Sequence, residues 1–222
     1  MGTRLRSILY RGKEAVSVIS EEMLAELRRK VAGHMSGKRY AHTLGVEAEM
    51  RKMAEIYMPE EVAVAAAAGL LHDITKGMTP EEQLAYCAQN GITVSDTERA
   101  APQILHAKTA VHYIEKHFPD FADPVILSAI GKHTTGSPRM TLLDTMLYIA
   151  DFIEKGRQYA SCQKLRAEFW GGMETATDKK RFLDEMLLAA YNYSLEALAR
   201  MDAVVSPETL HAKEALLARL NG

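Results

Sequence analysis

Apolar positions along the chain follow the three- and four-residue spacing of amphipathic helices, and the alternating runs typical of strands are scarce. Between residues 36 and 57, for example, Leu44, Val46, Met50, Met53 and Ile56 would be buried. Capping residues divide the pattern into segments, as in TPEE at 79–82, which is a capping box. The pattern predicts helices at about 20–33, 36–57, 59–73, 79–90, 103–117, 124–132, 142–155, 181–201 and 206–222. We therefore predict an all-α helical bundle.

Three segments interrupt the helical pattern. The sequence GITVS at 91–95 has the composition of extended chain, and the Gly-Gly pair at 171–172, followed by METATDKK, predicts a loop insertion. Residues 1–19 carry several arginines and are predicted to form a basic N-terminal arm. We expect the remaining residues, 20–222, to form a single domain, because a chain of 222 residues has the usual length of one domain.

Composition and charge narrow the class of partner. The chain has 27 basic and 29 acidic residues and a formal net charge of -2, so we do not expect binding by broad phosphate neutralisation along nucleic acid. The longest apolar stretch, 62–71, is about half of the roughly 20 residues that span a bilayer, so no membrane partner is predicted. Arginines interrupt the N-terminal apolar residues, and Cys87 and Cys162 lack the spacing of a zinc or redox motif. We therefore predict a cytoplasmic protein.

Candidate chemistry lies in segments that should otherwise be buried. His72 and Asp73 end the run AVAAAAGLL, and Asp151 lies inside LLDTMLYIADFI. A buried carboxylate is costly unless a cation or a strong donor compensates its charge. In chain order the candidates are His42, His72, Asp73, His106, His133 and Asp151, each on or beside a predicted helix. Imidazoles and carboxylates that converge inside a bundle form an open nitrogen and oxygen site for a divalent transition metal, and no thiolate site is expected.

These residues occur in phrases that resemble a known family. The phrases are RYAHTLGV at 39–46, LHDITKG at 71–77, ILHAKTA at 104–110, AIGKHTTG at 129–136 and TLLDTMLYIADFIEKGR at 141–157. The pattern H, HD, D is similar to that of the HD-domain metal-dependent phosphohydrolases, and more closely to the YqeK-type symmetrical bis(5'-nucleosyl)-tetraphosphatases. The likeness covers about residues 20–220. It implies an HD-domain helical bundle that cleaves diadenosine tetraphosphate or a related dinucleoside polyphosphate into two nucleoside diphosphates.

The resemblance also implies roles for individual residues. The expected metal ligands are His42, His72, Asp73 and Asp151, and the expected metal is iron. His106 and His133 would either hold a second ion or bind the polyphosphate directly. The expected catalytic residues are Asp73, Lys76, His106 and His133. The expected nucleotide contacts are Arg39, Lys76, Gly77, Met78, Thr79, His106, His133, Thr134, Arg157, Val204 and Pro207, where basic side chains would meet the charge of the phosphates.

Several alternatives remain open from the sequence alone. Lys76 and Arg157 would contact phosphate, or they would be a solvated lysine and a helix-end arginine. Asp144 and Glu154 would support the ligands or serve the helix only. Other functions compatible with the pattern are a different HD-type nucleotide phosphohydrolase or phosphodiesterase, a di-iron oxygenase, and a non-catalytic nucleotide-sensing module. Apolar helix faces are compatible with a homodimer.

Overall fold

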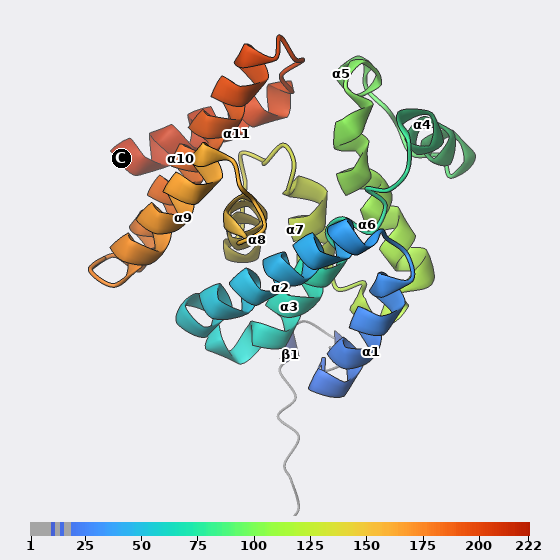
Figure 1. Cartoon of the computed structure of the whole chain (residues 1–222), viewed down its shortest axis with the longest axis horizontal. Helices are drawn as coiled ribbons and strands as arrows, with labels where there is room; N and C mark the ends of the chain where they lie inside the picture. Colours follow the sequence, from blue (N-terminus) through green and yellow to red (C-terminus); the bar gives the residue numbers. More distant parts are fainter. Residues whose placement is uncertain (1–9, 12–13, 16–18) are drawn as a thin grey trace, which may run out of the picture.

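The computed structural model describes residues 10–11, 14–15 and 19–222, and this part of the chain is almost entirely helical (Figure 1). The prediction of an all-α fold is confirmed. The helices are α1 (Glu21–Ala32), α2 (Gly37–Tyr57), α3 (Val62–Leu71), α4 (Pro80–Gln89), α5 (Asp96–Ala100), α6 (Leu105–His117), α7 (Pro124–Lys132), α8 (Leu142–Ile153), α9 (Ala160–Met173), α10 (Lys179–Arg200) and α11 (Pro207–Asn221). Short 3-10 turns are η1 (Pro59–Glu61), η2 (Pro102–Ile104) and η3 (Pro119–Phe121).

Side-chain caps explain where many helices begin. Ser20 and Ser36 accept hydrogen bonds from backbone amides in the first turns of α1 and α2. Thr79 with Glu82 forms a reciprocal capping box on α4, as the sequence predicts. These side chains satisfy amide groups that have no partner inside the helix, so they fix the helix starts.

One predicted loop is wrong, because the Gly-Gly pair at 171–172 lies inside α9. Leu165, Phe169 and Met173 recur at four-residue spacing and are buried, which keeps this segment helical. Two glycines cost about 1 kcal/mol each relative to alanine inside a helix, and burial of the large side chains offsets that cost. The connection to α10 is therefore confined to residues 174–178.

The other irregular segments also differ in detail from the expectation. Residues 92–95 are irregular rather than part of a strand, and Ser95 caps the short helix α5, which the sequence analysis missed. Within the expected N-terminal arm, the two-residue strands β1 (Tyr10–Arg11) and β2 (Glu14–Ala15) pair antiparallel. The rest of residues 1–18 lies outside the described residues, so the division at residue 19 stays a prediction.

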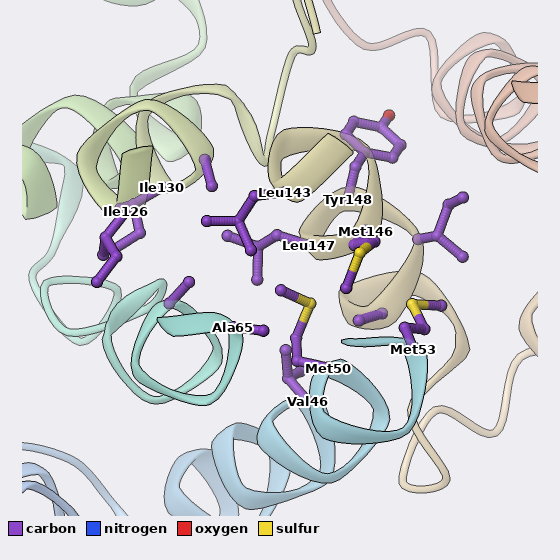
Figure 2. Packing of buried hydrophobic residues seen from close by; sticks show 14 of the residues in the cluster. Val46, Met50, Met53, Ala65, Ile126, Ile130, Leu143, Met146, Leu147 and Tyr148 are labelled. Atoms are coloured by element: carbon purple, nitrogen blue, oxygen red, sulfur yellow. The ribbon is translucent and has the colours of Figure 1, made fainter. Parts of the chain in front are cut away.

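The core lies where α2, α3, α7 and α8 pack together (Figure 2). Met50 from α2 lies near Leu147 from α8 and Met53 near Met146, while Ile126 and Ile130 from α7 lie beside α3. All of these side chains are fully buried. In Figure 1, α9, α10 and α11 lie on one side of this core, and α1 and α4 lie on the other. In the described part of the chain, no helix combines the length and the apolar composition that a bilayer span requires.

Helices α2 and α3 approach each other closely at Gly69. A Cβ atom at this position would lie 2.9 Å from the Cα atom of Glu47 and 3.1 Å from its backbone nitrogen. We expect Gly69→Ala to lower the free energy of unfolding by about 2 kcal/mol, because overpacking against backbone outweighs the better helix propensity of alanine. Urea unfolding measures this loss.

Gly37, on the same helix as Glu47, provides the matched control. A Cβ atom at Gly37 meets nothing within 4 Å, so Gly37→Ala should leave the stability unchanged or slightly increased. Equal stability of Gly69→Ala and Gly37→Ala would contradict the close packing of α2 on α3.

Candidate metal centre and its two cavities

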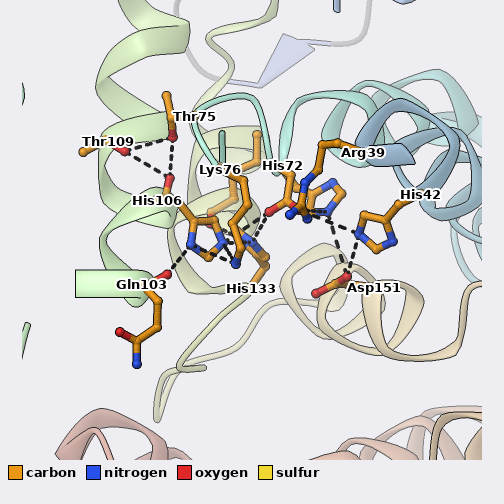
Figure 3. A network of polar contacts seen from close by, with 12 residues as sticks. Arg39, His42, His72, Thr75, Lys76, Gln103, His106, Thr109, His133 and Asp151 are labelled. Atoms are coloured by element: carbon orange, nitrogen blue, oxygen red, sulfur yellow. Dashed lines mark hydrogen bonds and ion pairs between the residues drawn. The ribbon is translucent and has the colours of Figure 1, made fainter. Parts of the chain in front are cut away.

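Six side chains from separate helices converge at one end of the core (Figure 3). His42 lies on the second turn of α2, and His72 and Asp73 lie where α3 ends. His106 begins α6, His133 ends α7, and Asp151 lies on the last turn of α8. The structure therefore brings together all of the residues that the sequence singles out as candidate ligands.

Asp73 is the centre of this cluster, because each of its carboxylate oxygens faces a different pair of histidines. Its Oδ2 atom lies 3.7 Å from Nε2 of His42 and 3.6 Å from Nε2 of His72. Its Oδ1 atom lies 3.2 Å from Nε2 of His106 and 3.5 Å from Nε2 of His133. The two groups, His42 with His72 and Asp73, and Asp73 with His106 and His133, each have donor atoms close enough to share a cation.

Asp151, on α8, lies beside the first of these groups. Its Oδ1 atom lies 3.0 Å from Nε2 of His42 and 4.0 Å from Nε2 of His72. Arg157 forms an ion pair with the same oxygen and also donates through Nε to the backbone carbonyl of Asp151. This guanidinium compensates the charge of a carboxylate on an otherwise buried helix.

All four histidines turn the same ring nitrogen towards the centre. The Nδ1 atoms of His72, His106 and His133 lie 2.8, 2.6 and 2.6 Å from the backbone carbonyl oxygens of Gly69, Gln103 and Ile130. A carbonyl only accepts, so each Nδ1 carries the proton and each Nε2 keeps a lone pair. An acceptor on one nitrogen is the usual device that orients a metal-binding histidine.

The equivalent partner of His42 is a carboxylate. The Nδ1 atom of His42 lies 3.0 Å from Oε1 of Glu154, which ends α8 and is buried. Oε2 of Glu154 accepts the backbone N–H of Gly156, and a Cβ atom at Gly45 would collide with this carboxylate. Glu154 therefore fits against Gly45 and Gly156, where a side chain would collide with it. Of the two roles that the sequence left open for Glu154, support of the ligand His42 agrees with this geometry.

Burial and neighbouring charges set the protonation of the cluster. Burial lowers the pKa of His72 and of His106 to about 4, so both rings are neutral at pH 7. Burial opposes ionisation of Asp73, but the surrounding histidines hold its pKa well below the usual range. Burial also opposes the charged form of His42, yet Asp151 and Glu154 raise its pKa to about 9. His42 would have to release its Nε2 proton before it binds a metal.

Buried hydrogen bonds hold the turn that carries Asp73 in place. Thr75 donates to the backbone carbonyl of His106 over 3.0 Å, and Gln83 donates to the carbonyl of Thr75 over 2.7 Å. Thr109 donates to the side chain of Gln83 over 2.7 Å. These contacts fix the turn to α4 and α6, and the sequence pattern gave no sign of them.

Three cationic side chains surround the cluster. Arg39 donates to Oδ2 of Asp73 over 2.7 Å, and Lys76 places its Nζ atom 2.9 Å from Nε2 of His106. Burial lowers the pKa of Lys76, while Asp73 and Asp151 act in the opposite direction. Lys76 and Arg157 thus contact side chains of the cluster, and Arg157 also binds a carbonyl in the last turn of α8. Their contact with phosphate stays a prediction.

A divalent metal fits the donors present. The Nε2 atom of His72 is buried and has no hydrogen-bond partner among the described residues, and its nearest carboxylate oxygens lie 3.6 and 4.0 Å away. A buried nitrogen without a partner is unusual and needs an explanation such as an ion. Neutral imidazoles and carboxylates are ligands that divalent transition metals accept. Asp144 has a different role, because it belongs to the capping box of α8 and pairs with Lys132 over 2.6 Å.

Two cavities adjoin the cluster. The larger, of about 1050 Å³, is lined by Lys76, His106, His133, Asp151 and Arg157 at its inner end, and by Thr134 and Val204 further out. The smaller, of about 890 Å³, is lined by Arg39, Gly77 and Met78 and runs along α4. Among the described residues, Thr79 caps α4 and Pro207 begins α11, and neither lines either cavity.

Comparison with known proteins gives the same family. The sequence pattern of the HD domain matches residues 39–156. The chain is 26% identical to a symmetrical bis(5'-nucleosyl)-tetraphosphatase of Halalkalibacterium halodurans over 84% of this chain and 93% of that protein. It is 30% identical to the protein of the same name from Bacillus subtilis over 66% of this chain and 75% of that protein.

A solved structure shows the same fold. It is the crystal structure of a protein from Clostridium acetobutylicum described as a predicted HD superfamily hydrolase involved in NAD metabolism. The two chains are 27% identical and superpose with a TM-score of 0.76, over 88% of this chain and 97% of the other.

Proposed function

The chain belongs to the HD-domain family of hydrolases, and on that premise we propose that it cleaves dinucleoside tetraphosphates symmetrically into two nucleoside diphosphates. Two relatives with this activity in their names support the substrate. The observation that carries the proposal is the position of Asp73 between two groups of histidines, in a cluster of which His106, His133 and Asp151 line the larger cavity. In the reaction, water forms a new P–O bond, the bond to the central bridging oxygen breaks, and the two products share the two hydrogen atoms of water.

The proposed ligands of the metal are His42, His72, Asp73 and Asp151, with Asp73 free to share its second oxygen with an ion at His106 and His133. We propose iron as the metal because the resemblance to the HD-domain phosphohydrolases implies it, and the nitrogen and oxygen donors are compatible with it. A bound divalent metal would supply Lewis-acid polarisation of a phosphoryl oxygen and would lower the pKa of water.

Two cationic side chains, Lys76 and Arg157, would stabilise the negative charge of the phosphates. Lys76 and Arg157 lie at the inner end of the larger cavity, where the phosphates of one half of the substrate would enter. Their N–H groups would donate to phosphoryl oxygens as charge moves onto the leaving diphosphate. His106 and His133 would keep their Nε2 atoms aimed at the same point, because backbone carbonyls hold their Nδ1 protons. No side chain of the cluster needs to form a covalent bond to phosphorus.

One nucleoside would occupy the larger cavity. Thr134 and Val204 line its outer part, together with the aromatic rings of Tyr148, Tyr159 and Tyr193. A volume of about 1050 Å³ with aromatic side chains beside charged and hydroxyl groups suits a nucleoside and its phosphates. Pro207, at the start of α11, does not line this cavity, whereas its neighbours Ser206 and Thr209 do.

Two features favour this function over the alternatives. The set of histidine and carboxylate donors favours an enzyme over a nucleotide-sensing module, and the relatives named symmetrical bis(5'-nucleosyl)-tetraphosphatase favour a hydrolase over a di-iron oxygenase. Free, buried Cys87 and Cys162 are compatible with our proposal that the enzyme works in the reducing cytoplasm.

Product analysis tests the proposed function. Metal-loaded protein is incubated separately with diadenosine tetraphosphate, diadenosine triphosphate and adenosine triphosphate, and the products are separated by ion-exchange chromatography. The expected result is ADP as the only product of the tetraphosphate. Formation of ATP and AMP, or preference for adenosine triphosphate, would show a different HD-type phosphohydrolase.

Glu154 provides a test of how the histidines are oriented. We expect Glu154→Gln to weaken metal binding by about 10- to 100-fold, because the amide is a poorer acceptor for the Nδ1–H group of His42. Calorimetric titration with Mn²⁺ measures this loss. Glu115→Gln, at an exposed position of α6, is the matched control and should bind Mn²⁺ like the parent protein. Unchanged Mn²⁺ affinity in Glu154→Gln would contradict the role of this carboxylate.

A further inference from the structure

The residues expected to contact the nucleotide do not share one cavity. Lys76, Thr134, Arg157 and Val204 line the larger cavity. Arg39, Gly77 and Met78 line the smaller cavity, between the α1–α2 turn and α4. Figure 1 shows α4 on one side of the bundle and α9, α10 and α11 on the other. The expected contacts therefore divide into two groups that flank the cluster.

Arg39 links the smaller cavity to the cluster. It lines this cavity while its guanidinium donates to Asp73 over 2.7 Å. Lys76 lines the larger cavity and Gly77, the next residue, lines the smaller one. The turn that carries Asp73 therefore contributes to the lining of both cavities, although the six side chains of the cluster do not line the smaller one.

The wall of the smaller cavity suits an aromatic base. Tyr86 and Tyr113 line it with ring centroids 6.4 Å apart, and Met35 and Met78 add flexible apolar surface. The Tyr86 hydroxyl lies 2.9 Å from Nδ1 of His112, which holds this ring in place. Base-on-aromatic stacking needs only a π-face, and Gln89 offers amide groups to the edge of a base.

The size of the cavity also agrees with a nucleoside. Its volume is about 890 Å³, within the range of ligand pockets. Its wall follows α4 from Met78 to Gln89, and the ten residues of this helix rise roughly 15 Å at 1.5 Å per residue. A phosphate at Arg39 and a base near Tyr86 would then lie at opposite ends of the same groove.

Symmetrical cleavage leaves one nucleoside on each side of the broken bond, so the substrate offers a second nucleoside for such a site. A dinucleoside tetraphosphate has two equal halves, and in-line displacement places the attacking and leaving oxygens on opposite sides of the phosphorus. The half that leaves must extend away from the half that is attacked. We propose that the groove lined by Arg39, Met78, Tyr86 and Tyr113 binds the second nucleoside of the substrate. This inference rests on the proposed function and names the site of the other half.

A groove-filling substitution tests the inference with little effect on the fold. Ala85 is exposed on α4 and lines the groove, whereas Ala88 is exposed on the same helix and does not line it. We expect Ala85→Trp to lower kcat/KM for diadenosine tetraphosphate by roughly tenfold, since a stacked base contributes about 1–3 kcal/mol. Ala88→Trp should stay within about twofold of the parent protein, and both variants should bind Mn²⁺ normally. Tyr86→Leu, which removes the stacking face, should show a similar loss to Ala85→Trp.

Binding of the product separates this inference from the proposed function. Calorimetric titration of the Mn²⁺-loaded proteins with ADP needs no turnover, so it gives a result even if the tetraphosphate is not a substrate. The expected stoichiometry is two ADP molecules per chain in the parent protein and in Ala88→Trp, and one in Ala85→Trp. The same stoichiometry in Ala85→Trp as in the parent, or equal kcat/KM in the two tryptophan variants, would overturn the second nucleoside site.

Discussion

Replacing Asp73 with alanine is expected to abolish both metal binding and turnover. Both oxygens of this carboxylate face histidine Nε2 atoms at 3.2–3.7 Å, so its removal takes one donor from each of the two groups. We expect kcat to fall by on the order of 10³-fold or more, because a metal contributes several kcal/mol of charge stabilisation. Metal analysis after dialysis and an ADP-release assay measure the two losses.

The control for this variant is Asp120→Ala, which removes an exposed carboxylate from η3. It should retain full metal occupancy and activity. Loss of metal in Asp73→Ala could also arise from unfolding, so the helical circular dichroism signal of both variants is compared with that of the parent. Full metal content and turnover in a folded Asp73→Ala would contradict the metal centre.

Lys76→Met is expected to keep the metal and to lose activity. The methionine side chain has a similar length but carries no charge, so the donor set of Asp73 and the histidines remains. We expect kcat to fall by roughly 10²-fold, the usual cost of removing one preorganised donor to a developing charge. Steady-state kinetics on metal-saturated protein measure this change.

Lys116→Met, at an exposed position near the end of α6, is the matched control. It should match the parent protein in kcat and in metal content. If Lys76→Met lost its metal as Asp73→Ala is expected to do, Lys76 would support the ligands and would not act on the substrate. An unchanged kcat would exclude both roles.

Much of the helical framework could be predicted because capping is local. Ser20, Ser36 and Thr79 begin helices at the residues where the pattern places them. The pattern failed at α9, where the glycines at 171–172 signal a loop and only tertiary burial of Phe169 and Met173 keeps the helix. Helix α5 was missed because five residues are too few to show a helical period.

The candidate site, like the fold, could be predicted from the sequence only in part. The histidines and aspartates are recognisable in the sequence because their order and neighbouring phrases are distinctive. Their partners are less recognisable, since the role of Glu154 depends on the missing side chain of Gly45 on another helix. The contact of Arg39 with Asp73 joins residues 34 positions apart, and the position of the smaller cavity depends on how α4 packs on α6. No local pattern contains that information.

The central claim is that side chains from α2, from the end of α3 and from α8 hold a divalent metal at Asp73. An anomalous difference map from a crystal of the full chain loaded with Mn²⁺ tests it most directly. The account predicts a peak bounded by the Nε2 atoms of His42 and His72 and by the carboxylates of Asp73 and Asp151. A fully loaded crystal whose only peaks lie away from Asp73 would contradict it.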